Sequence, residues 1–145
     1  MSLKTAKTLL KVMGILSIIG AVLGFISAII MFVGGGLVAA NPEIMEGTEG
    51  AEQAGPVLIG VGIGALISAV IELLDGIFSV RASKDSAKWK PAWIFAILSL
   101  IASVITLIMG IIQNGASGII SNLVSIVLAV LIFVAANTVK SDAGQ

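Results

Sequence analysis

Two acidic residues interrupt an otherwise apolar stretch at residues 69–79, which reads AVIELLDGIFS. They are Glu72 and Asp75, and the stretch contains no basic residue. A spacing of three residues places both carboxyl groups on one face of a helix. Ionisable groups inside a membrane-spanning helix are costly and commonly mark a proton or ion pathway. If this stretch crosses a membrane, the two carboxyl groups have the chemistry to bind or transfer a proton or a cation.

The two carboxyl groups differ in their expected depth. Counting back from Arg81 at about 1.5 Å per residue puts Glu72 roughly 13 Å and Asp75 roughly 9 Å inside the span. Interfacial lysines can reach Asp75 by snorkelling, so an ordinary structural role is expected for it. For Glu72 two alternatives remain open. The first is a protonated carboxyl that is hydrogen-bonded to serine or asparagine, and the second is a carboxylate that holds water or a cation.

The composition favours lipid as the solvent of this chain. Of its 145 residues 58% are hydrophobic and 11% are charged, and the mean hydropathy is +1.17. A soluble domain has about 25% charged residues. The sequence contains no cysteine and no histidine, which excludes disulfides and thiolate metal sites and removes the commonest acid–base side chain. We therefore predict no enzymatic activity, no catalytic residue, no metal site and no cofactor.

Four apolar runs are long enough to cross a bilayer, which takes roughly 20 residues in a helix. They cover residues 9–40, 57–80, 91–112 and 118–138. The pattern predicts an all-α integral membrane protein, with residues 1–145 forming one domain built as a four-helix transmembrane bundle. The first run is too long for one span, so we expect its helix to tilt or to leave the membrane near Gly34, Gly35 and Gly36.

The basic residues indicate the orientation of the chain. They lie at residues 4–11 around the start of the first run, in the loop 81–90, and at Lys140 after the last run, whereas the loop 41–56 contains four glutamates and no base. The positive-inside rule then places both termini and the loop 81–90 in the cytoplasm. We expect a multi-pass protein of the plasma membrane or the bacterial inner membrane. Trp89 and Trp93 are typical of side chains that anchor a helix at the lipid headgroups.

Small residues at four-residue spacing predict the helix contacts. Lipid supplies no hydrophobic force between helices, so side chains that allow close approach mark the interfaces. The residues of the first two runs that fit this pattern are Gly20, Gly24, Gly60, Gly64 and Ser68. Glu72 and Asp75 continue the face of the second run. Such a stripe packs helices within one chain, or joins the chain to a second copy or to another membrane protein.

The two halves of the sequence resemble each other. Residues 15–23 read ILSIIGAVL and residues 97–105 read ILSLIASVI, each after a basic segment. This similarity indicates a tandem repeat of helical hairpins. In addition, ELLDGIFSVRASKD at residues 72–85, followed by KPAWIFAILSLI, resembles a pattern in small four-span bacterial membrane proteins of unknown function. That resemblance implies the architecture and a bacterial inner membrane, and it implies no activity.

Two functional hypotheses follow from these observations. The first is a non-enzymatic structural or interaction protein, a four-helix bundle that associates with itself or with another membrane protein. The second is an oligomeric small transporter or channel subunit that handles protons or cations through Glu72, with Asp75 as a further candidate. The expected partners are the lipid bilayer and a membrane protein, and no nucleic acid.

Overall fold

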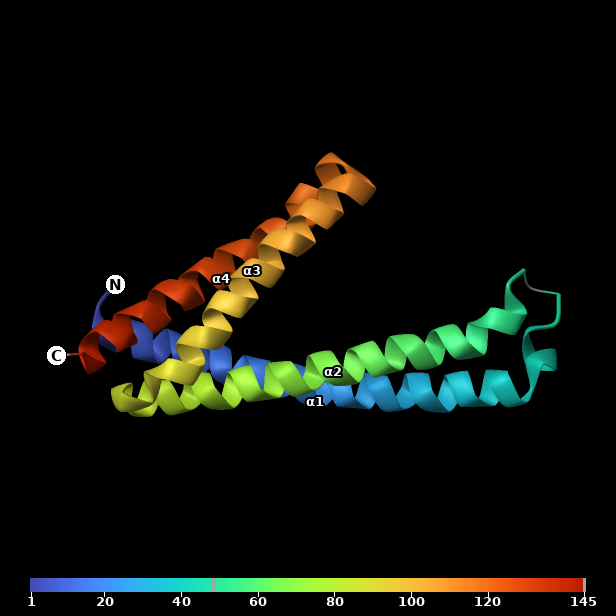
Figure 1. Cartoon of the computed structure of the whole chain (residues 1–145), viewed down its shortest axis with the longest axis horizontal. Helices are drawn as coiled ribbons and strands as arrows, with labels where there is room; N and C mark the ends of the chain where they lie inside the picture. The colour runs from blue at the N-terminus through green and yellow to red at the C-terminus, as the bar shows by residue number, and fades with distance from the viewer. Residues whose placement is uncertain (48, 145) are drawn as a thin grey trace. The chain divides into compact units, whose positions relative to one another are not determined.

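The computed structural model describes residues 1–47 and 49–144, and these residues form helices without any strand. The prediction of an all-α fold is therefore confirmed. The four long helices are α1 (Leu3–Ala40), α2 (Ala51–Lys84), α3 (Trp89–Asn114) and α4 (Ala116–Ala143) (Figure 1). Two short 3₁₀ helices connect them, η1 (Pro42–Met45) after α1 and η2 (Ser86–Lys88) after α2.

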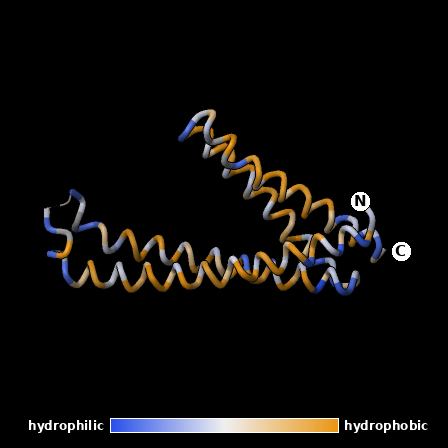
Figure 2. The backbone as a smooth tube through the Cα atoms, turned by 180° about the vertical axis from the view of Figure 1, so that it is seen from behind, coloured by the Kyte–Doolittle hydropathy of each residue, from blue (hydrophilic) through white to orange (hydrophobic). Residues whose placement is uncertain are grey.

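Each of the four long helices is long and apolar enough to cross a membrane. Apolar residues fill the middles of the helices and hydrophilic residues gather at their ends (Figure 2). In the most apolar 18-residue window of each helix at most 22% of the residues are buried. So much exposed aliphatic surface requires lipid or another apolar partner, and the chain has the make-up of a multi-pass membrane protein.

All four helices extend beyond the predicted spans, and α1 and α2 are the longest. Helix α1 has 38 residues and α2 has 34, whereas about 20 residues suffice to cross the hydrocarbon layer. Helix α2 begins at Ala51 and carries Pro56 inside its second turn. Proline has no backbone N–H, so the carbonyl oxygen of Glu52, four residues earlier, lacks its usual partner within the helix. The loop expected at residues 41–56 is thus mostly helical.

The chain divides into two compact units, which are described separately. Unit 1 comprises Met1–Leu16 and Asp75–Gln145, and unit 2 comprises Ser17–Leu74. Helices α1 and α2 each contribute a segment to both units, while η2, α3 and α4 belong to unit 1.

In unit 2 the segments of α1 and α2 lie side by side along a seam of small residues (Figure 1). The buried residues recur every seven positions on each helix; they are Ala21, Ala28 and Gly35 on α1 and Gly55, Gly62 and Ala69 on α2. A seven-residue repeat keeps one face of a helix turned toward its partner over many turns. Glycine and alanine at these positions allow the two backbones to approach closely, which is how helices associate in lipid.

Contacts along the seam fix an antiparallel register. A Cβ added at Gly55 would lie 2.9 Å from the backbone nitrogen of Ala39, and one added at Gly24 would lie 3.0 Å from the Cβ of Ala69. Between these two contacts, a Cβ at Gly62 would lie 3.2 Å from the Cβ of Met31. The helices are therefore in contact along the whole described length of unit 2.

Helix α1 continues through its three consecutive glycines and ends at Ala40. The expected tilt of this helix, or its exit from the membrane near these glycines, stays a prediction. Gly35 is buried, and a Cβ there would lie 3.0 Å from the carbonyl oxygen of Gly55 and 2.9 Å from Ile59. A Cβ at Gly34 or Gly36 would meet nothing within 4 Å. Packing at the central glycine offsets the low helix propensity of the three residues.

Unit 1 contains a small core to which all four long helices contribute. Its buried residues are Ala6, Leu10, Ala82, Ala92, Ala96, Ala135, Ala136 and Val139. Gly14 brings α1 against α2 here, since its added Cβ would lie 2.8 Å from the carbonyl oxygen of Gly76. Gly14 and Gly76 continue the seven-residue spacings of their helices. Segments of all four helices thus pack together within this unit, and alanine makes up most of their core.

The second hairpin of the chain turns on one residue. Gly115 separates α3 from α4 and adopts φ +59° and ψ −135°, a conformation that residues with a Cβ rarely adopt.

The proposed repeat also finds a parallel in the burial pattern of unit 1. Aligning Ile15 with Ile97 pairs Leu10 with Ala92, and both of these residues are buried in unit 1. The duplication itself stays a prediction.

The neighbouring glycines of α1 provide a test of the seam. We expect Gly35→Ala to lower the free energy of unfolding by about 1–3 kcal/mol, because the backbone oxygen of Gly55 cannot move aside easily. The matched change Gly36→Ala places its methyl group in open space, so it should raise that free energy by up to about 1 kcal/mol through helix propensity. Denaturant titration of both variants in detergent, followed by circular dichroism, measures the difference. Equal effects of the two substitutions would contradict the seam.

Candidate functional site

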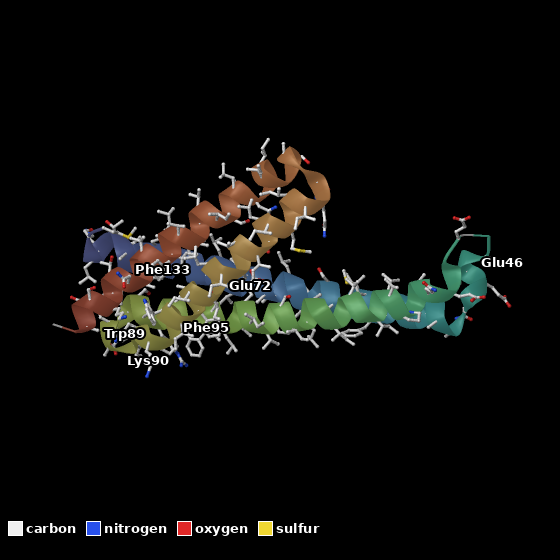
Figure 3. The ribbon with its side chains drawn as sticks, turned by 45° about the horizontal axis from the view of Figure 1, so that its top comes forward. Glu46, Glu72, Trp89, Lys90, Phe95 and Phe133 are labelled. Atoms are coloured by element: carbon white, nitrogen blue, oxygen red, sulfur yellow. The ribbon has the colours of Figure 1, made fainter. Side chains whose placement is uncertain are left out.

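Glu72 lies on α2 against the backbone of α1 within unit 2 (Figure 3). A Cβ added at Gly20 would lie 2.5 Å from Glu72 Oε1 and 3.1 Å from its Cδ. The carboxyl group therefore occupies the space that any other residue at position 20 would fill. Gly20 thus has a more specific role than general helix packing, because it makes room for an acid.

The Glu72 side chain is exposed at the surface of the chain. In the part of the chain that the structure describes, no hydrogen-bond partner is found for its carboxyl group. A carboxyl group in an apolar layer without partners is costly. Neither alternative for Glu72 is decided by this geometry. The carboxyl group is nevertheless open to a group from outside unit 2, such as water, a cation or another chain.

Asp75 belongs to unit 1 and is half-buried. It lies next to Gly76, which contacts α1 at Gly14. The structural role expected for Asp75 is compatible with this position beside a close helix contact. Because Glu72 and Asp75 fall in different units, each carboxyl group is considered by itself.

The predicted packing residues divide into two groups. Gly20 and Gly24 face α2, where Gly24 contacts Ala69 and Gly20 contacts Glu72. By contrast, Gly60, Gly64 and Ser68 are exposed, and a Cβ added at either glycine would meet nothing within 4 Å. These three residues do not form the seam between α1 and α2, which uses Gly55, Gly62 and Ala69 instead. Their role in packing stays a prediction for some other contact.

We call residues Gly60, Gly64 and Ser68 the outer stripe of α2. They recur every four residues along the helix, and one further step of four residues reaches Glu72. All four residues are exposed. The exposed carboxyl group of Glu72 therefore lies at the end of the outer stripe, which is an exposed surface of small residues.

The two tryptophans form a cluster with a lysine in unit 1. The rings of Trp89 and Trp93 meet edge to face, with centroids 5.9 Å apart. Lys140 of α4 places its Nζ 3.8 Å from the centroid of the Trp93 ring and 5.2 Å from that of Trp89. An ammonium group over an indole face is attracted by the negative face of the ring. The cluster therefore fastens the end of α4 to the start of α3.

This cluster was not predicted from the sequence, in which Trp89 and Trp93 were expected to anchor the helix at lipid headgroups. Trp93 buries its Nε1, and within the described ranges 1–47 and 49–144 no hydrogen-bond acceptor reaches it. Its ring thus packs against protein. No local signal in the sequence pairs Lys140 with tryptophans that lie a whole hairpin earlier. The anchoring of either tryptophan in lipid stays a prediction.

The described residues contain no group of three or more histidine, cysteine, aspartate or glutamate side chains that could hold a metal ion. One ion pair is found in the loop between α2 and α3, where Lys88 lies 3.9 Å from Asp85. Asp85 also accepts a hydrogen bond from the backbone N–H of Ala87 at 3.0 Å. These contacts order the basic loop and provide no reactive group.

Comparison of the chain with protein families, with curated proteins and with solved structures finds no match.

The tryptophan cluster leads to a prediction about stability. We expect Lys140→Met to lower the free energy of unfolding by about 0.5–2 kcal/mol, because the apolar stem remains and the cation over the rings is lost. Lys140→Arg should retain most of the stability. Tryptophan emission reports on this cluster alone, since the chain contains 2 tryptophans and both are in it. The emission maximum should shift in the Met variant.

The control for this experiment is Lys84→Met, which removes the same charge from an exposed position of α2. It should leave both the emission maximum and the unfolding free energy unchanged. If Lys84→Met and Lys140→Met have the same effects, the cation over the rings makes no specific contribution.

Proposed function

We propose that this chain is a non-enzymatic structural or interaction protein of the membrane, which associates through its helices with a second copy or with another membrane protein. The observation that carries the proposal is the outer stripe of α2. Its residues Gly60, Gly64 and Ser68 are exposed and leave open space above the helix. A second helix can approach such a surface closely, and close approach is the main source of helix association in lipid.

The charge distribution supports an orientation for this protein. Arg81, Lys84, Lys88 and Lys90 are exposed around the turn from α2 to α3, and the remaining basic residues lie near the two ends of the chain. With both termini and this turn in the cytoplasm, every basic residue is on one side of the membrane. The proposed location is the plasma membrane, or the inner membrane of a bacterium.

Self-association through the outer stripe can be tested with Gly64→Leu. The added side chain fills the space above α2 without touching the seam, so the monomer should stay folded while the oligomer is lost. Because the chain has no cysteine, Ser141→Cys provides one labelling position for energy transfer between copies in liposomes. We expect strong energy transfer for the parent and a loss of at least about ten-fold in association for Gly64→Leu, which corresponds to 1.4 kcal/mol.

A matched control for this experiment is Gly36→Leu, which adds the same side chain at a glycine of α1 that also meets nothing within 4 Å. This variant should associate as the parent does. A parent that is monomeric in liposomes would contradict self-association, and equal loss in the two variants would contradict the outer stripe as the interface.

The second candidate function is a small transporter or channel subunit that handles protons or cations through Glu72. The observation that favours it is the exposed carboxyl group, which lies on Gly20 at the end of the outer stripe. Four helices rarely enclose a pathway by themselves, so an oligomer would form it. In that case Glu72 would face the interface between copies, where small residues leave room for water.

Glu72→Gln separates the two candidate functions. The amide has the same size and cannot ionise, so the fold and the association should persist while transport is lost. We expect proton or cation flux into liposomes to fall to the background of empty liposomes if Glu72 carries the ion. Absence of flux in the parent, or unchanged flux in the Gln variant, would exclude Glu72 as the ion carrier. The structural or interaction function would then be the remaining candidate. The association assay above, repeated on Glu72→Gln, verifies that the oligomer is intact.

A further inference from the structure

The first turns of α1 carry a hollow that neither candidate function uses. It is a shallow hollow on one face of the helix, wide open to the surroundings, with a volume of about 360 Å³, and it lies within unit 1. Its lining residues are Lys4, Thr5, Thr8, Leu9 and Val12. The other side of this helix segment is buried in the core of unit 1 through Ala6 and Leu10. The helix segment that lines the hollow is therefore packed against protein on its opposite face.

The lining changes from polar to apolar along the helix. Lys4 and Thr5 lie at its N-terminal end, and Leu9 and Val12 lie at the other end. Thr8 donates its hydroxyl proton to the carbonyl oxygen of Lys4 at 2.9 Å, so this hydroxyl is already used as a donor. The polar end thus offers the Lys4 ammonium group and the Thr5 hydroxyl group to a ligand.

The Thr5 hydroxyl is oriented by its neighbour. Ser2 Oγ and Thr5 Oγ1 are 2.7 Å apart, and Ser2 Oγ also accepts a hydrogen bond from the backbone N–H of Thr5 at 3.2 Å. When Ser2 donates its proton to Thr5, the Thr5 proton is free to point elsewhere. Next to a lysine, such a hydroxyl suits an anion with several acceptor oxygens, and a phosphate group is of this kind.

The length of the hollow indicates what is attached to the anion. From Lys4 to Val12 the helix rises about 12 Å, whereas the polar layer of one leaflet is only about 5–8 Å thick. A hollow that starts in the headgroup layer must therefore end beside the acyl chains. Its ligand needs an anionic head and an apolar body, which is the chemistry of an anionic phospholipid.

We infer that this hollow binds one anionic phospholipid. Lys4 and Thr5 contact the headgroup phosphate, and Leu9 and Val12 contact the glycerol region and the first carbons of an acyl chain. Lys7 and Lys11 lie in the same segment and add to the attraction of an anionic surface. Neither of them lines the hollow, so they attract anionic lipid without selecting one molecule.

Native mass spectrometry of the full chain in detergent tests this inference. The probe is dioleoylphosphatidylglycerol, with dioleoylphosphatidylcholine for comparison and glycerol 1-phosphate as the headgroup alone. We expect retained binding of the anionic lipid, and a loss of about five-fold in affinity for Lys4→Gln, as for one lysine near an anionic surface. An excess of glycerol 1-phosphate should not displace the lipid.

The matched control is Lys11→Gln, which removes the same charge from an exposed position of the same segment. It should keep the parent's affinity to within about two-fold, because a detergent micelle lacks the anionic surface that would attract a lysine outside the hollow. Equal losses for the two variants would show diffuse attraction and overturn the site. Displacement by glycerol 1-phosphate would overturn the phospholipid, since the headgroup alone would then suffice. Circular dichroism verifies that both variants are folded.

Discussion

Close approach of helix backbones is the interaction on which this structure depends. In lipid the exposed aliphatic side chains gain nothing by leaving their surroundings, so helices are held by packing at short range. The seam of unit 2 provides this packing with glycine and alanine at every seventh position, and Gly14 with Gly76 does the same in unit 1. An added Cβ would lie within 3.0 Å of a backbone atom at Gly14, Gly35 and Gly55, so these positions cannot be enlarged without moving a backbone. The rest of each helix surface is free to be bulky and apolar.

The distribution of residue sizes follows from this constraint. In a soluble protein the large aliphatic residues fill the core, whereas here the fully buried large side chains of the described residues are Leu10 and Val139. Isoleucine, leucine and valine are mostly exposed instead. The few specific contacts between side chains therefore gain in importance. Phe78 and Phe95 form one such contact, with ring centroids 5.5 Å apart, and the cluster of Lys140 with the two tryptophans forms another. Both connect helices of unit 1 that the small residues alone would hold less specifically.

The number and type of the helices could be predicted from the sequence, because apolar runs of this length have few alternatives in lipid. The face on which α2 contacts α1 could not be predicted from the four-residue spacing. Gly60, Gly64 and Ser68 fit that spacing as well as any contact face does, yet Gly62 and Ala69 form the seam. The seven-residue spacing of Gly55, Gly62, Ala69 and Gly76 was a better signal, since it persists along the whole helix. The placement of Glu72 on Gly20 depends on register, which spacing within one helix does not define.

The turn at Gly115 couples the two helices that it joins. With a connection of one residue, neither α3 nor α4 can slide along its own axis without carrying the other. The connection between α1 and α2 is longer and acidic, so it restricts sliding much less, and the register of that pair depends on the seam instead. The two hairpins therefore fix their registers in different ways, even where their sequences resemble each other.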